Sequence, residues 1–299
     1  MEVLETIPVR MILGSRDYLS DRTGRKPKLF KLPVSNDIFL YPEAPQVKDL
    51  DTVIDGLALL RDLLVAITMF NEESKYNQFD LSALNQASKE FIDQVLGEGD
   101  ISATIKVNKG DIKHIEIQQS LMAGVWRIKH INRLGQVGVE YLEIATFPTA
   151  IVNKCATLNK MQPAGRALSK KQKGRKSNTT DFDNRALIHE LNKRGKEYSA
   201  SSQSFVVNLA SLPMNKDDMS DLENLLGIDE VNMCSRVYGN CQISATSCIN
   251  TWWIKYFDAK DRVLLNTLEV VDIPSITKAS NRDIAYSALR IKNTLVFYD

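Results

Sequence analysis

Apolar residues recur along the first half of the chain with helical and then strand-like spacing. Intervals of three or four residues predict helices over residues 51–67 and 82–96, with a short strand at 76–81 between them. Four runs rich in β-branched residues follow, separated by Gly or Asn turns, and they predict strands at 101–107, 112–119, 125–131 and 139–145. This half therefore predicts an α-β-α-β-β-β-β unit.

The same order of elements returns in the second half. Helices are expected at 183–198 and 216–226 around a strand at 205–209, and four strand-like runs and a last helix at 279–292 follow. An ungapped offset of 126 residues aligns 117–148 with 243–274 and gives eight identities, including Trp126/Trp252, Lys129/Lys255 and Glu143/Glu269. The fold class is therefore expected to be α+β, with two tandem copies of one unit.

The repeat also predicts domain boundaries. Residues 1–50, rich in Pro and Gly, are expected to form an extended N-terminal arm, and residues 51–151 the first copy. Residues 152–182 accumulate Lys and Arg and predict a basic flexible linker, and residues 183–299 form the second copy with a C-terminal helix. No aromatic residues for base stacking lie among the linker's charges, so a solvated connector is favoured over a nucleic-acid tail.

The repeated Lys and Glu residues suggest a strand register. If the last two strands of each copy form hairpins around residues 136 and 262, Lys129 lies opposite Glu143 and Lys255 opposite Glu269. In that register Trp126 and Ile128 meet Leu142 and Ile144 on one core face.

Composition removes several classes of function. The 299 residues are 43% hydrophobic and 25% charged with a net charge of +1, which disfavours nucleic acid or an anionic membrane as the partner of the whole molecule. No apolar run reaches the length of a membrane helix, and the N-terminal residues carry charges too early for a signal peptide. We expect a cytoplasmic protein with reduced thiols and no membrane insertion.

Candidate reactive groups are scattered. Cys234, Cys241 and Cys248 are spaced by seven residues, which on one continuous strand puts successive side chains on opposite faces. A turn at residues 239–240 would instead pair Tyr238 with Cys241 and leave Cys234 opposite Ala245, and neither geometry gathers the three thiols. Structural thiols are favoured, and an iron–sulfur or redox role stays open as the alternative. The three histidines have no metal-binding spacing and no nucleophile–base motif is present. We expect no catalytic site, no metal and no cofactor.

Several of these segments resemble one known family. Residues 95–101, VLGEGDI, resemble the VLGEGEV signature of the HupH/HyaF family of hydrogenase expression/formation proteins, with Asp100 in place of the usual Glu. Residues 124–128, GVWRI, are similar to the family's GVWRV strand. The second copy is similar to the family's C-terminal pattern at YGNCQISAT (238–246), WWIKYF (252–257) and LEVVDIP (268–274). The resemblance spans residues 52–290 and leaves the arm and the linker unmatched.

The resemblance implies an accessory or chaperone role in [NiFe] hydrogenase assembly. It implies action on the hydrogenase small-subunit precursor before export, together with a thioredoxin-like accessory protein. We expect partner contacts at two turns thought to occupy roughly corresponding places in the two copies: Gly97, Glu98, Gly99 and Asp100, and Tyr238, Gly239, Asn240, Cys241 and Gln242. The alternative for both turns is a purely structural role, and the alternative function is an iron–sulfur or redox carrier using Cys234, Cys241 and Cys248.

Overall fold

The computed structural model describes residues 44–71, 77–107, 110–160, 182–201, 203–237 and 239–298. Most of the expected arm and residues 161–181 of the expected linker therefore lie outside the described residues. The first half contains η1 (Leu50–Val53), α1 (Ile54–Thr68), β1 (Gln78–Asp80), α2 (Gln86–Leu96), β2 (Ile101–Lys106), β3 (Ile112–Gln119), β4 (Val125–Asn132), β5 (Val137–Ile144) and α3 (Thr149–Lys160). The second half contains α4 (Asn184–Glu197), β6 (Phe205–Asn208), η2 (Leu209–Ser211), α5 (Lys216–Leu226), β7 (Val231–Ser235), β8 (Asn240–Ala245), β9 (Thr251–Phe257), β10 (Val263–Val270), η3 (Ser275–Thr277) and α6 (Asn281–Leu295).

Equivalent helices in the two halves begin and end with the same local chemistry. Asn85 accepts a hydrogen bond from the amide of Ser88 at the start of α2, and Asn215 forms a capping box at the start of α5. The helices end at Gly97 (φ +54°) and Gly227 (φ +61°), where the backbone enters the region that favours glycine. These local signals explain why both helix ends are predictable from sequence.

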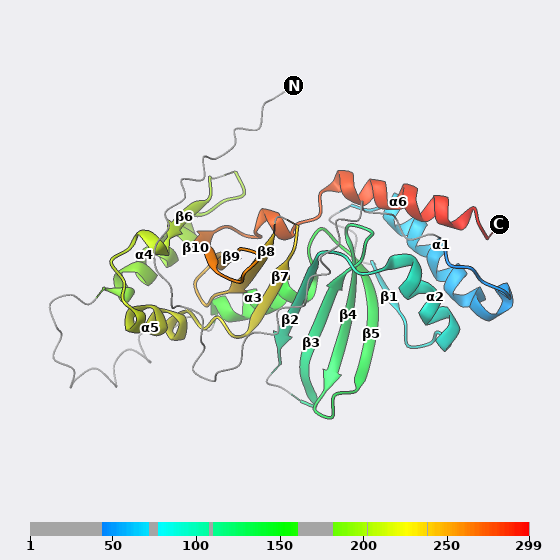
Figure 1. Ribbon diagram of the computed structural model, residues 1–299, viewed down its shortest axis with the longest axis horizontal. Coiled ribbons are helices and arrows are strands. Elements are labelled where there is room, and N and C mark those ends of the chain that lie inside the picture. Colours follow the sequence, from blue (N-terminus) through cyan, green and yellow to red (C-terminus); the bar gives the residue numbers. More distant parts are fainter. Residues whose placement is uncertain are drawn as a thin grey trace, which may run out of the picture. The chain divides into compact units, whose positions relative to one another are not determined.

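The ten strands of the described residues form one antiparallel sheet in the order β1-β5-β4-β3-β2-β7-β8-β9-β10-β6, shown in Figure 1. The α+β class is confirmed, and the halves are joined edge to edge through β2 and β7. The pairing at this seam is Ile101 with Ser235, Ala103 with Met233 and Ile105 with Val231. An offset of 130 residues carries Ile101 to Val231 and Ile105 to Ser235, so exchanging the halves reproduces the same register. A pseudo-two-fold axis therefore passes through the Ala103–Met233 pair.

One face of the sheet carries a core shared by both halves. Trp126 and Ile128 from the first half pack in the same buried cluster as Trp252 and Ile254 from the second. Phe147 lies between the two tryptophans, with edge-to-face ring contacts at centroid distances of 6.5 Å to Trp126 and 6.2 Å to Trp252. Because this core includes residues of both halves, we expect their folding to be coupled.

Helix α3 completes the shared core. Its buried residues Ile151 and Leu158, two helical turns apart, belong to the same cluster as the tryptophans. Residues 152–160 of the segment expected as a linker are thus helical, and the apolar residues at this spacing are the physical reason. The start of α3 is held by the Glu143 carboxylate, which accepts a hydrogen bond from the Thr149 amide at 3.1 Å.

The opposite face carries the other helices in two separate cores. Helices α1, α2 and α6 pack over the first half, and helices α4 and α5 over the second. The expectation that Leu142 and Ile144 share a face with Trp126 and Ile128 is wrong, because Leu142 and Ile144 belong to the core under α1 and α2. No helix among the described residues has the length and apolar content needed to cross a membrane.

The expected Lys–Glu register is also wrong. Lys129 lies opposite Glu140, and Glu143 lies opposite Trp126 on the other face. In the second half, Lys255 lies opposite Asn266 and Glu269 opposite Trp252. Each hairpin turns about two residues earlier than expected, around residues 134 and 260. A bulge between His130 and Ile131 in one hairpin and between Val263 and Leu265 in the other then shifts the pairing by one residue, which places each Lys and its Glu on opposite faces.

Candidate functional site

A band of polar side chains crosses the middle of the sheet face that carries α1, α2, α4, α5 and α6. The band lies between α2 and α5. We call it the polar strip, and its members alternate with the shared core along four strands: Ser102, Thr104, Glu116, Gln118, Asn232, Cys234, Gln242 and Ser244. Directly paired residues of adjacent strands point to the same face, as do residues two apart along one strand. The side chains of Thr104 and Cys234, at the centre of the strip, are exposed.

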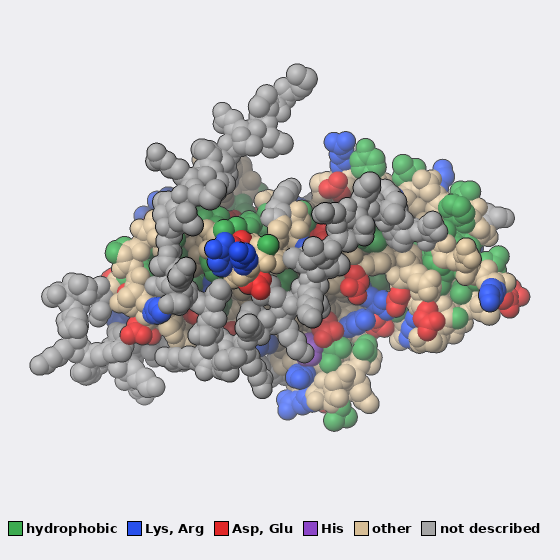
Figure 2. Space-filling model, in the orientation of Figure 1, with side chains coloured by type: hydrophobic (Ala, Val, Ile, Leu, Met, Phe, Trp, Pro, Cys, Tyr) green, Lys and Arg blue, Asp and Glu red, His purple; other side chains and the backbone are tan. Residues whose placement is uncertain are grey.

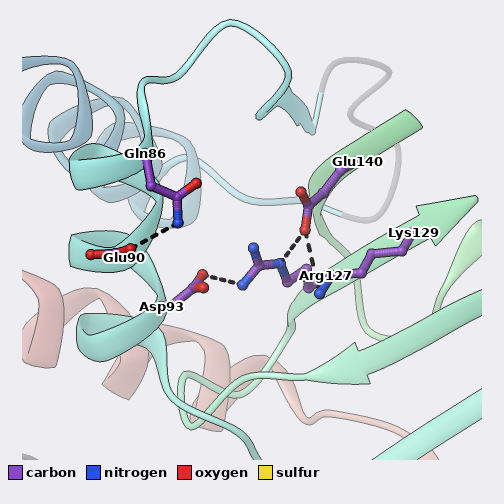
Figure 3. Close-up of polar contacts among 6 residues, drawn as sticks. All are labelled: Gln86, Glu90, Asp93, Arg127, Lys129 and Glu140. Carbon is purple, nitrogen blue, oxygen red and sulfur yellow. Dashed lines mark hydrogen bonds and ion pairs between the residues drawn. The ribbon is translucent and has the colours of Figure 1, made fainter. Parts of the chain in front are cut away.

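Ion pairs connect the first-half edge of the strip to helix α2. Arg127 on β4 reaches Asp93 on α2 with one guanidinium nitrogen, and its Nε lies 2.7 Å from the Glu140 carboxylate on β5 (Figure 3). Lys129 lies 3.6 Å from the same Glu140 oxygen. Arg127 and Glu140 are largely buried, so this network fixes the distance between α2 and the sheet.

The second-half edge uses different residues at the equivalent positions. Trp253 replaces Arg127, and its indole nitrogen donates a hydrogen bond to Asn266, which replaces Glu140. Lys255 lies 3.1 Å from Glu223 on α5 and 4.7 Å from the centroid of the Trp253 ring. A shallow pocket is lined here by Ile228, Gln242, Ser244, Trp253 and Lys255.

The two turns singled out in the sequence are brought together, though they are not equivalent in the repeat. The Arg236 amide donates to the Asp100 carbonyl at 3.0 Å, and its guanidinium donates to the Gly99 carbonyl at 3.2 Å. The Arg236 side chain also lies 3.8 Å from the Asp100 carboxylate. The turn at 97–100 thus lies beside the turn that joins β7 and β8.

The expected correspondence between these turns is wrong. The equivalent of Gly97 is Gly227, because both end the second helix of their copy. At the other end of the seam, Lys106 takes the place of Arg236: its amide donates to the Glu230 carbonyl at 2.8 Å and its side chain lies 3.8 Å from Asp229. The seam is therefore held by similar contacts at its two ends.

The predicted partner-binding residues differ in accessibility. Glu98 and Gly239 are exposed, and Asn240 and Gln242 are half-buried, with Gln242 on the polar strip. Gly99 is buried against the Ser120 carbonyl, where a Cβ would lie 2.4 Å away. Cys241 points into the shared core. Tyr238 lies outside the described residues.

The three cysteines of the alternative function are not brought together. Cys234 is exposed on the polar strip, Cys241 lies in the shared core, and Cys248 lies in the core under α4 and α5. Burial raises the pKa of the Cys241 thiol and of the Cys248 thiol to about 12, which disfavours the thiolate form that binds metals. Within the described ranges, no group of three His, Cys, Asp or Glu side chains is placed to hold a metal ion.

Glu143 is buried and its equivalent Glu269 is half-buried, and neither was predicted to lie beside a tryptophan. Burial raises the pKa of the Glu143 carboxyl and that of the Glu269 carboxyl, which lie beside equivalent tryptophans in the two halves. One oxygen of Glu143 is bound by Thr149, and its other oxygen is buried without a hydrogen-bond partner among the described residues. The identity of Glu143 and Glu269 in the aligned repeat was the available signal, and it was assigned to an ion pair instead.

Fold and site together define a duplicated α+β protein whose copies share one sheet and one core. Comparison with known families gives this class a name. The model of the HupH hydrogenase expression protein, C-terminal conserved region, matches the chain twice, over residues 53–168 and 182–298. The chain therefore belongs to the HupH family and carries this conserved region in both halves.

Curated relatives match most of the chain. The hydrogenase expression/formation protein HupQ of Azotobacter chroococcum is 30% identical over 274 residues, which cover 90% of this chain and 92% of the relative. HupH of Rhizobium leguminosarum is 29% identical and covers 79% of each chain. The hydrogenase-1 operon protein HyaF of Escherichia coli is 29% identical, covering 71% of this chain and 70% of its own length.

Proposed function

We propose that this protein is a cytoplasmic, non-catalytic accessory protein of [NiFe] hydrogenase maturation. In this proposal it binds the hydrogenase small-subunit precursor before export and works with a thioredoxin-like accessory protein. The observation that carries the proposal is the 30% identity to a hydrogenase expression/formation protein over 90% of this chain. The family resemblance supplies the identity of the two partners.

The geometry suits binding of a polypeptide. The polar strip offers hydrogen-bonding side chains in the middle of a sheet, where the ion pairs of Arg127 and Lys255 fix the flanking helices. Next to one end of the strip lie Glu98 and Gly239, the two exposed members of the predicted turns. We propose that the strip and these turns form the surface that contacts the precursor.

Deletion of the gene tests the role in maturation. We expect an unstable or cluster-deficient hydrogenase small subunit, measured by immunoblot and iron content, while other iron–sulfur enzymes keep their activity. The deletion is complemented with the wild-type gene as control. Unchanged hydrogenase activity, or the joint failure of every iron–sulfur enzyme, contradicts the proposal.

An iron–sulfur or redox carrier is the second candidate, because Cys234 is exposed and Cys241 lies on the neighbouring strand. The separate locations of the three thiols favour the accessory role over it. Visible absorption of anaerobically purified protein distinguishes the two, since a bound cluster absorbs there. About one iron per chain, lost on Cys234→Ser, would establish the carrier.

A further inference from the structure

The outer surface of the helix pair formed by α1 and α6 is apolar. The two helices pack side by side in the first-half core (Figure 1). The Tyr298 hydroxyl, just after α6, donates to the Pro45 carbonyl, shortly before η1, at 2.6 Å, so the end of α6 lies by the start of α1. The helices, each of 15 residues, therefore run antiparallel. Outward from this pair point six large apolar side chains, each more than half exposed: Ile54, Val65, Met69, Tyr286, Leu289 and Val296.

These side chains follow the spacing of a surface on which helices pack. On α1 the exposed apolar residues are eleven and four residues apart, and on α6 they are three and seven apart. Such intervals are made of steps of three and four, which keep side chains on one helical face and let two helices interdigitate. Each helix thus has one apolar face toward the core and a second one toward solvent.

The equivalent helix of the second half lacks this second apolar face. The offset of 128 residues that relates β1 to β6 carries the buried Leu63 of α1 to the buried Leu191 of α4. The same offset carries the exposed Val65 to the exposed Lys193. Among the residues that the structure describes, α4 and α5 expose no large apolar side chain. Since water-facing positions of this fold are polar in one copy, the apolar ones on α1 and α6 indicate a contact surface.

The charges of the two helices point to a second copy of the chain as the partner. Residues 50–68 hold three acids and one base, and residues 281–295 hold three bases and one acid. A two-fold axis parallel to the helices would place α1 of each copy on α6 of the other, so that the acidic helix meets the basic one twice. This operation also brings Asp55, in the first turn of α1, to the level of the partner's Lys292, in the last turn of α6.

We infer that this surface is the interface of a homodimer, in which α1 and α6 of two copies form a four-helix bundle. Antiparallel helices of equal length with apolar residues at steps of three and four are the components of such bundles. The side chains of the polar strip project from β2, β3, β7 and β8 and take no part in this contact. The dimer is therefore independent of the proposed function.

Sedimentation velocity of the full-length protein over a dilution series tests the inference. We expect a species of twice the 33.7 kDa of one chain, which dissociates on dilution. Val65→Lys, which installs the second copy's residue, should raise the dimer Kd about a hundredfold, because its ammonium would lose water in an apolar interface. Leu289→Lys on α6 should do the same, and it covers the case in which circular dichroism shows that Val65→Lys does not fold. Leu264→Lys, at a 68% exposed side chain near the start of β10, is the matched control and should leave Kd unchanged.

A charge exchange tests the arrangement of the four helices. Asp55→Lys and Lys292→Asp should each raise the dimer Kd about fivefold, because each places like charges across the interface twice. The double variant should restore the wild-type Kd, since acid and base then face each other with exchanged positions. High salt should reduce the differences among these variants.

Four results would overturn the inference or its arrangement. A monomeric mass at every concentration overturns the dimer, as does a Kd that is unchanged in both Val65→Lys and Leu289→Lys. Equal weakening by Leu264→Lys also overturns it, because the loss would not be local to the helices. If the double charge exchange does not restore Kd, α1 does not lie on the partner's α6. A monomer that binds the hydrogenase small-subunit precursor less tightly after Val65→Lys would assign the surface to that partner instead of a second copy.

Discussion

The two halves build the same strands but cover them with different helix layers. Helix α1 buries six residues, five of them large and apolar, whereas the equivalent helix α4 buries Asn184, Leu191 and Gly195. The difference arises because α6, at the end of the second copy, packs against α1 in the first-half core. Helix α4 instead packs directly on the loop between β8 and β9, where Gly195 meets the Ile249 carbonyl.

The two halves therefore kept the same sheet after duplication, whereas their helix layers became different. Helix α6 contacts the β3–β4 loop through Ser287, which donates to the Ala123 carbonyl, and its outer side keeps the apolar residues Tyr286 and Leu289 exposed. Green side chains along α6 mark this surface in Figure 2. The sheet could not diverge as freely, because its shared core contains residues of both copies.

The largest expected effect comes from removing the ring between the two tryptophans. Phe147→Ala leaves a cavity against Trp126 and Trp252, and we expect the free energy of unfolding to fall by about 3–5 kcal/mol. Because the core is shared, urea unfolding followed by circular dichroism and by tryptophan fluorescence should give one coincident transition that moves as a whole. Phe297→Ala, at a side chain that is 74% exposed, is the control and should change stability by less than about 0.5 kcal/mol. Two separate transitions, with only one shifted, would show that the halves fold independently.

A smaller effect on stability is expected at glycines where a helix closely approaches another segment of the chain. An added Cβ at Gly195 on α4 would lie 2.1 Å from the Ile249 carbonyl oxygen, whereas one at Gly56 on α1 would lie 3.0 Å from the Phe91 ring. We expect Gly195→Ala to lower the free energy of unfolding by about 1–3 kcal/mol. Gly56→Ala should cost less, because the helix propensity of Ala offsets the strain by about 1 kcal/mol. Thermal unfolding of both variants checks the order, and a larger loss for Gly56→Ala would contradict the description of the helix layers.

The elements of both halves are predictable from sequence because their signals are local. Asn85 and Asn215 start helices, Gly97 and Gly227 end them, and alternation along the strands is visible without tertiary information. The separation of Cys234 from Cys241 onto opposite faces depends in addition on the register of β7 with β8, which pairs Cys234 with Gln242. The family is also recognisable from the motifs of both copies, and the family match confirms it.

The seam and the register are not predictable in this way. Pairing of β2 with β7 depends on two strand edges that are 126 or more residues apart in sequence, and nothing local marks them as partners. The bulges in the β4–β5 and β9–β10 hairpins depend on turn geometry, so Lys129 and Glu143 are assigned to one face although they lie on opposite faces. Of the pocket residues, Gln242 alone was predicted as a partner contact. Alternating polar positions from Ser102 to Ser244 were the signal that would have revealed the strip.

The ion pairs beside the strip provide a third comparison between the halves. Arg127, which binds both Asp93 and Glu140, has a side chain that is 20% exposed, and we expect Arg127→Ala to lower the free energy of unfolding by about 1–2 kcal/mol. Lys255 binds Glu223, whose side chain is 39% exposed, and no buried carboxylate such as Glu140 is paired with it among the described residues, so Lys255→Ala should cost less than about 1 kcal/mol. Urea titrations at low and high salt measure both. Equal losses in the two variants would show that the different residues of the two edges are energetically equivalent.

The smallest expected effect concerns the pH dependence of stability at Glu143. Burial raises the pKa of this carboxyl in the folded protein, so the folded state holds the proton more tightly than the unfolded chain. Its stabilising contribution is complete below the ordinary pKa of 4.5 and is lost as pH rises through the higher folded pKa. Glu143→Gln removes this loss and keeps an oxygen for the Thr149 amide, so the variant should be more stable than the wild type at pH 7 and similar at pH 4.

Glu269→Gln is the matched variant in the second half. Burial also raises the pKa of the Glu269 carboxyl. This rise is opposed by a hydrogen bond that the Thr267 hydroxyl donates, whereas at Glu143 the donor is a helix amide. The same sign is therefore expected, measured as urea midpoints across this pH range. A Glu143→Gln variant that loses stability at pH 7 would show that the ionised carboxylate at the start of α3 is worth more than its burial costs.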